Sequence, residues 1–125
     1  MQSKPQKAPA IPSWVTAMVT NARCRANERG IPFDLVPQDV LELWELQCGN
    51  CYWFNIPMQW RDGEGPRNPL IPTLDRADNS RGYVRSNVVL ACWGANAAKG
   101  SSGLDQWEEF LGFVQHGLAT KGKIG

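Results

Sequence analysis

Two aspartates, three arginines and several asparagines lie close together in residues 72–100, PTLDRADNSRGYVRSNVVLACWGANAAKG. If Asp75 ends one strand and Asn96 begins a helix packed on it, both side chains face one ion. Carboxylate and amide oxygens suit a hard divalent cation such as Mg²⁺, whose shell is completed by water and substrate phosphate. The plainer interpretation is that Asp75 caps a turn and Asn96 caps a helix. Spacing alone favours that plainer interpretation.

Two helices are expected ahead of this stretch. Residues 13–30 have apolar residues at helical intervals, with Ser13 as a plausible N-cap and Gly30 as a natural stop. Residues 37–47 open at Pro37 and carry a broad apolar face.

The remaining segments are shorter and more varied. Residues 48–58, rich in aromatic side chains, predict short strands joined by a turn, and the Gly- and Pro-rich residues 59–69 predict a loop. Residues 101–118 predict a last helix, in which Ser102 and Asp105 have the spacing of a capping box. The order of elements predicts a small α+β domain.

At 125 residues the chain is expected to form one domain. We expect a flexible N-terminal arm over 1–12, the folded domain over 13–118 and a flexible C-terminal tail over 119–125. A formal net charge of +1 neither requires nor excludes nucleic acid as a partner. No run of 18 apolar residues and no secretory signal is present, so a membrane protein is not expected.

The segment LDRADNSRGYVRSNVVLACWGANAAKG resembles the ββα-metal core of the HNH, or His-Me finger, endonucleases. It is most similar to a phage- and bacterium-associated branch written Leu-Asp-Arg-x-Asp, Gly-Tyr, Asn-Val, Trp-x-x-Asn-x-x-Lys. The upstream pieces RCRANERGIPFDL and CGNCYWFNIPM resemble that branch's lead-in helix and hairpin, so the likeness extends over 20–112. It implies an α+β fold: a small HNH-like ββα-metal finger with flanking N- and C-terminal helices.

The resemblance also implies roles for individual residues. Asp75 stands at the family's first metal-binding aspartate, and Asn96 stands at the metal ligand that opens the helix. Asn87 stands at the middle asparagine, which braces the loop and orients the catalytic group. Lys99 sits on the helix, where it would contact phosphate.

Arg76 stands where most of the family has the histidine that activates water. Arginine stays protonated in proteins and is a poor base, so Arg76 would instead clamp a phosphate oxygen. Asp78 is the nearest carboxylate that could act as base. The alternative is a metal-bound water that ionises with help from substrate phosphate. The single histidine, His116, lies in the predicted last helix and is expected to be an ordinary helix residue.

Basic residues on both sides of the motif are candidate DNA contacts. Arg81, Arg85, Lys99 and Arg67 are expected to bind phosphates of the DNA backbone. Their alternative role is that of ordinary solvated charges.

The cysteines raise a second question about metals. Many HNH proteins hold a structural zinc with two Cys-x-x-Cys pairs. Cys48 and Cys51 make the first pair and Cys92 begins the second, but Ala95 stands at the fourth position. A structural zinc normally has four closed ligands. The sequence therefore favours thiols packed as small buried hydrophobes over zinc.

Together these observations predict a DNA endonuclease that hydrolyses phosphodiester bonds of double-stranded DNA with Mg²⁺ or Mn²⁺. Its expected setting is the cytoplasm of a bacterial host, and a phage origin fits the branch. The alternative is a catalytically impaired HNH-fold module that acts as a DNA- or protein-binding factor. The sequence leaves open homing or nicking roles, the DNA target and the choice between monomer and dimer.

Overall fold

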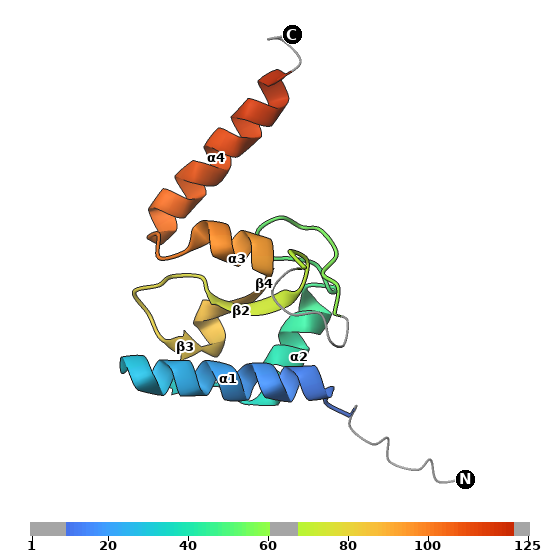
Figure 1. Ribbon diagram of the computed structural model, residues 1–125, viewed down its shortest axis with the longest axis vertical. Coiled ribbons are helices and arrows are strands. Elements are labelled where there is room, and N and C mark those ends of the chain that lie inside the picture. Colours follow the sequence, from blue (N-terminus) through green and yellow to red (C-terminus); the bar gives the residue numbers. More distant parts are fainter. Residues whose placement is uncertain (1–9, 61–67, 122–125) are drawn as a thin grey trace, which may run out of the picture.

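The computed structural model describes residues 10–60 and 68–121. Most of the expected arm 1–12, part of the expected tail 119–125 and the candidate DNA contact Arg67 lie outside the described residues. In chain order the elements are α1 (Ser13–Arg29), β1 (Phe33–Asp34), α2 (Pro37–Leu46), β2 (Pro72–Arg76), β3 (Tyr83–Val84), the short 3-10 helix η1 (Arg85–Asn87), β4 (Val88–Cys92), α3 (Trp93–Lys99) and α4 (Leu104–Thr120). The described chain is thus a small α+β fold, as the sequence predicts (Figure 1).

A strand–strand–helix unit carries the polar stretch. Strand β2 pairs antiparallel with β4, so that Asp75 lies opposite Val89. Strand β4 runs directly into α3 at Trp93. Because side chains alternate along a strand, Leu74 and Asp75 point to opposite faces of the β2–β4 hairpin.

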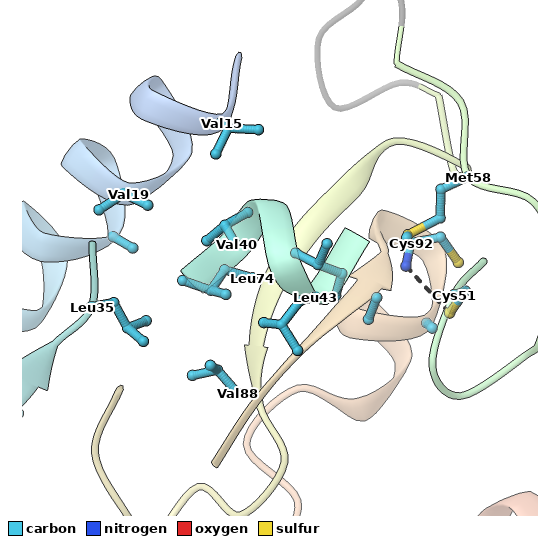
Figure 2. Packing of buried hydrophobic residues seen from close by; sticks show 14 residues of the cluster. Val15, Val19, Leu35, Val40, Leu43, Cys51, Met58, Leu74, Val88 and Cys92 are labelled. Carbon is cyan, nitrogen blue, oxygen red and sulfur yellow. Dashed lines mark hydrogen bonds between the residues drawn. The ribbon is translucent and has the colours of Figure 1, made fainter. Parts of the chain in front are cut away.

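The hydrophobic core fills one face of this hairpin. Figure 1 shows β2 and β4 between α3 on one side and α1 on the other, with α2 beside them. Leu74 of β2 belongs to one buried cluster with Val15 and Val19 of α1 and Val40 of α2 (Figure 2). Leu90 of β4 is part of the same cluster. This packing fixes the hairpin on the helices and directs Asp75 toward α3.

Both helices expected ahead of the motif are confirmed, with one change at the first. Gly30 ends α1 in the left-handed conformation, with φ of 67°, as the sequence predicts. Ser13 is already inside α1, Pro12 occupies the N-cap position, and no side chain caps the helix. Pro37 begins α2, and the carboxylate of Asp39 accepts a hydrogen bond from the Val36 amide.

Two local predictions are wrong. Residues 48–58 form turns with a single bridge, Asn50 to Pro57, in place of paired strands. Cys48 and Asn55 have positive φ angles of 54° and 51°, which an extended pairing does not allow.

The predicted capping box at α4 is the second error. Gly103 holds the N-cap position, and its amide donates to Oε1 of Gln106. The Ser102 amide is already used, because it donates to the carbonyl of Lys99 as α3 ends. With Gly103 as the N-cap, the third helical position of a capping box is Gln106, and Asp105 lies one position before it.

Helix α4 projects away from the rest of the molecule (Figure 1). Of its described side chains only Trp107 is buried, and it contacts the edge of Trp53 at a centroid distance of 5.9 Å. In the described ranges each helix is too short or too polar to cross a bilayer.

Candidate functional site

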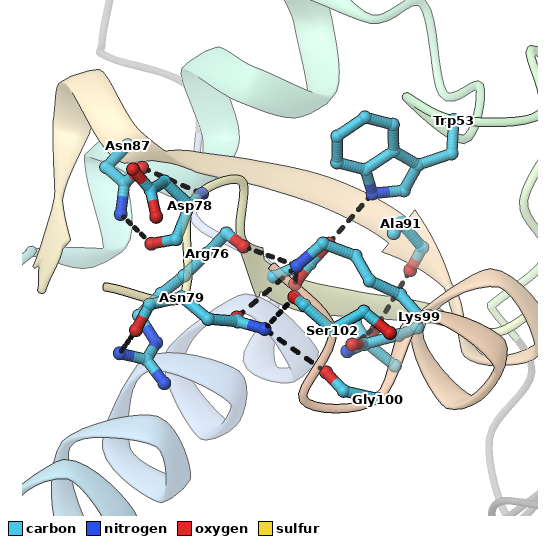
Figure 3. A network of polar contacts seen from close by, with 12 residues as sticks. Trp53, Arg76, Asp78, Asn79, Asn87, Ala91, Lys99, Gly100 and Ser102 are labelled. Carbon is cyan, nitrogen blue, oxygen red and sulfur yellow. Dashed lines mark hydrogen bonds and ion pairs between the residues drawn. The ribbon is translucent and has the colours of Figure 1, made fainter. Parts of the chain in front are cut away.

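A polar network that includes Trp53, Asn79 and Lys99 lies between β2 and α3 (Figure 3). Asp75 of β2 bonds to two of its members, Trp53 and Lys99. Its side chain is only 4% exposed. Oδ2 accepts a hydrogen bond of 2.8 Å from the indole N–H of Trp53, and Oδ1 lies 3.2 Å from Nζ of Lys99. A carboxylate has about four acceptor positions, so each oxygen of Asp75 can still take one more partner.

Lys99 is the buried cation of this network. Its ammonium donates to Asp75, to the Arg76 carbonyl at 2.8 Å and to Oδ1 of Asn79 at 3.3 Å. The side chain has no exposed surface. The expected contact between Lys99 and a DNA phosphate is therefore corrected. The last turn of α3 points this side chain into the protein, where all three donor positions are used.

Asn96 lies on the same face, one turn before Lys99 on α3. Its amide N–H donates to Oγ1 of Thr73 at 3.0 Å, and the Thr73 hydroxyl donates in turn to the carbonyl of Ala91. This chain of hydrogen bonds fixes the amide plane. Within the described residues no hydrogen bond reaches Oδ1 of Asn96, so that oxygen remains available to a ligand.

A cavity of about 200 Å³ joins the two candidate ligands. Asp75 and Asn96 both line it, together with Arg76 and, from α1, Arg25 and Arg29. Lys99 already balances the charge of Asp75. The three guanidinium groups therefore leave the cavity with a positive balance that suits a phosphate.

Arg76 is held in place at this cavity. One guanidinium nitrogen, Nη1, donates to the carbonyls of Asn79 and Arg81 at 2.9 and 3.0 Å. The guanidinium also stacks over the Tyr83 ring at 5.2 Å. In the described part of the chain its other nitrogens make no hydrogen bond, so they can still bind an anion.

Asn87 braces the loop between β2 and β4. Its side chain accepts a hydrogen bond from the Asp78 amide and donates to the carbonyls of Asp78 and Gly82. Asn87 is buried, and the loop carries the carbonyls that hold Arg76. Asn87 thus fixes the loop that holds Arg76, and it does not line the cavity.

Asp78, the candidate base, does not line this cavity either. Its Oδ1 accepts hydrogen bonds from the hydroxyl and the amide of Ser80, at 2.7 and 2.9 Å. These two hydrogen bonds, aided by Arg81, lower the pKa of Asp78 below its usual value of 3.8. A carboxylate so stabilised is a weak base and acts mainly to shape the turn.

Asp78→Asn is expected to lower the stability of the protein near neutral pH but not in strong acid. The folded-state pKa of Asp78 is lowered, so its contribution is complete above the unfolded-state value and is lost as pH falls through the lowered one. The urea midpoints of wild type and variant should converge as pH falls. Asp34→Asn, an exposed aspartate on β1, is the matched control. Equal effects of the two substitutions at every pH would contradict this role of Asp78.

The structure does not bring the other candidate residues to the cavity. Arg85 lies 3.9 Å from Glu42 in a solvent-exposed ion pair, and Arg81 donates to the hydroxyl of Ser86. His116 is exposed on α4. Arg81 and Arg85 therefore remain candidates only for DNA contacts outside the cavity.

Arg25 and Arg29 are the cavity residues that the motif does not indicate. They follow each other by one helical turn on α1, so both side chains lie on one face of that helix. The only signal in the sequence is a concentration of basic residues in the first 30 positions.

The four cysteines differ in their surroundings. Cys51 and Cys92 belong to the core, where the Cys92 amide donates to the sulfur of Cys51, while Cys48 and Cys24 are exposed. Burial raises the pKa of the Cys92 thiol. Across the residues that the structure describes, no three His, Cys, Asp or Glu side chains are grouped as metal ligands.

The geometry thus offers two oxygen ligands, one from a carboxylate and one from an amide, beside three arginines in one cavity. Comparisons of the chain with family models, with curated proteins and with solved structures find no match.

Proposed function

We propose that the protein is a divalent-metal-dependent DNA endonuclease of the HNH type, which hydrolyses phosphodiester bonds of double-stranded DNA. The observation that carries this proposal is the shared cavity of Asp75 and Asn96, which lies beside Arg25, Arg29 and Arg76. The proposed setting is the cytoplasm of a bacterial host, and the protein itself is proposed to be phage-related.

The donor set fits Mg²⁺ or Mn²⁺ by type. Asp75 keeps acceptor capacity on each oxygen. Asn96 lines the cavity, and the hydrogen bond from its amide nitrogen to Thr73 leaves Oδ1 without a hydrogen bond among the described residues. A divalent ion bound there supplies Lewis-acid polarisation of the phosphate and a more acidic water. The Lys99 ammonium lies 3.2 Å from Oδ1 of Asp75, so Asp75 would hold the ion while it stays paired with Lys99.

The arginines bind and orient the scissile phosphate. Arg76 is fixed by two loop carbonyls and the Tyr83 ring, so little entropy is lost when its remaining N–H groups bind a phosphate oxygen. Arg25 and Arg29 face the same space from α1. Because these donors are positioned in advance, they stabilise the charge that develops on the phosphate in the transition state.

The proton of the attacking water needs an acceptor. Arg76 stays protonated, and Asp78 is both outside the cavity and stabilised as a carboxylate by Ser80. We therefore assign this role to a non-bridging oxygen of the substrate phosphate. The leaving 3′ or 5′ oxygen takes a proton from solvent.

A second function, a DNA- or protein-binding module with an impaired active site, is favoured by one observation. Asp75 is already paired with Lys99 and with the Trp53 indole. A binding module can use the arginine-lined cavity without any metal ligand.

Incubation of supercoiled plasmid with the protein separates the two functions. The endonuclease is expected to convert the plasmid to nicked or linear forms with Mg²⁺ or Mn²⁺ and to leave it intact in EDTA. Asn96→Ala, purified in the same way, controls for contaminating nuclease. A plasmid that stays intact with both metals, while a gel shift shows binding, would establish the binding module instead.

A further inference from the structure

A second cavity, of about 410 Å³, adjoins the arginine-lined one. Arg25, Leu74 and Asn96 line both cavities, so the two share a wall. The volume lies in the range of about 300–1,000 Å³ that is usual for small-ligand pockets in proteins. The second cavity therefore has room for one planar group attached to whatever occupies the first.

The indole rings of three tryptophans line this second cavity and make part of its surface aromatic. Trp14, Trp60 and Trp93 line it, and Trp60 and Trp93 are 40% and 41% exposed. Trp14 stacks on Trp60 with a centroid distance of 5.4 Å and an interplanar angle of 22°. Trp14 also rests against the edge of Trp44, at 5.2 Å. This packing fixes flat aromatic surfaces beside the cavity.

Polar side chains also line the second cavity. Asn21 and Arg25 are one helical turn apart on α1, and both line the cavity. Asn21 offers a donor and an acceptor, and Arg25 offers donors only. Flat aromatic faces with a few hydrogen-bonding groups are the features with which proteins bind unstacked nucleobases.

We propose that this aromatic cavity binds one unpaired nucleobase of the DNA strand whose phosphate enters the arginine-lined cavity. The proposal rests on the proposed function and specifies its substrate as DNA with a locally unpaired base. In a duplex both faces of a base are covered by its neighbours, and extruding the base costs unstacking and unpairing energy. The protein should therefore bind single-stranded DNA more tightly than fully paired DNA.

Ala17→Phe tests this proposal without touching the core. Ala17 is exposed on α1 and lines the aromatic cavity, so a phenylalanine there fills space that the base needs. Thr16→Phe adds the same ring at the neighbouring exposed position, which does not line the cavity. Circular dichroism checks that both variants keep the fold.

The probe is a short single-stranded DNA with one 2-aminopurine, titrated in EDTA so that no cleavage occurs. Stacking of one base on an aromatic side chain corresponds to a change in affinity of about 5- to 150-fold. Wild type and Thr16→Phe are expected to quench the 2-aminopurine and to bind the single strand more tightly than the paired duplex. Ala17→Phe is expected to lose affinity for the single strand by a factor in that range.

Two results would overturn the inference: equal affinity of wild type for the paired duplex and the single strand, or unchanged binding by Ala17→Phe. Neither result tests the endonuclease proposal, which the plasmid assay decides separately. If the base site behaves as expected and the plasmid stays intact, the cleavage function fails and the base site stands.

Discussion

Replacing Asp75 with alanine is expected to lower the free energy of unfolding by about 3–5 kcal/mol, because it leaves the Lys99 ammonium buried without its counter-charge. The lysine side chain has no exposed surface, and the carboxylate is 3.2 Å away. The Trp53 N–H loses its acceptor as well. A loss of this size is a large part of the roughly 5–15 kcal/mol that stabilises a typical domain. Urea denaturation of the purified variant measures it.

The double variant Asp75→Ala/Lys99→Met is the control for this effect. It removes both charges and keeps a long apolar side chain in the buried position, so it should recover much of the lost stability. Asp75→Ala with the stability of wild type would show that the ion pair contributes nothing to the fold. Equal stability of the single and double variants would show that the loss has another cause.

Replacing Asn96 with alanine is expected to reduce DNA cleavage by about a hundredfold or more while the protein stays folded. Loss of a residue that merely supports a metal ligand costs about 10–100-fold, and Asn96 is proposed as a ligand itself. Among the described residues its side chain makes one hydrogen bond, to Thr73, which contributes only about 1 kcal/mol to stability. Initial rates of plasmid nicking in Mg²⁺, with a urea melt beside them, measure both effects.

Asn96→Asp is the matched variant, because it keeps an oxygen ligand at the same position while it removes the amide donor and adds a negative charge. It should retain far more activity than Asn96→Ala. Wild-type cleavage by a folded Asn96→Ala protein would remove Asn96 from the metal site. Equal inactivity of both variants would point to the hydrogen bond with Thr73 as the feature that matters.

Much of the fold is readable from the sequence because local signals and burial agree there. Gly30 ends α1 and Pro37 begins α2 as predicted. The prediction fails at residues 48–58, where aromatic composition suggests strands. Positive φ angles and packing against the core decide otherwise.

The candidate site is only half visible in the sequence. The motif indicates Asp75 and Asn96, and they share a cavity. It indicates Lys99 as a phosphate contact and gives no sign that losing Asp75 would weaken the fold. The burial of Lys99 and the structural importance of Asp75 both follow from the packing of the last turn of α3 against β2, and this packing is a tertiary contact that local sequence does not reveal. The presence of Arg25 and Arg29 at the site is also a tertiary feature, because both extend to it from α1.

The ion pair between Asp75 and Lys99 joins residues that are 24 positions apart in the chain. It forms only after the β2–β4 hairpin has closed and α3 has docked on it. Arg25 and Arg29, by contrast, lie together on a single helix. The placing of the two arginines therefore depends on local helical structure, whereas the arrangement around Asp75 depends on contacts between distant parts of the chain. In terms of the proposed function, the phosphate-binding arginines need one helix, whereas the catalytic centre needs the whole assembled fold.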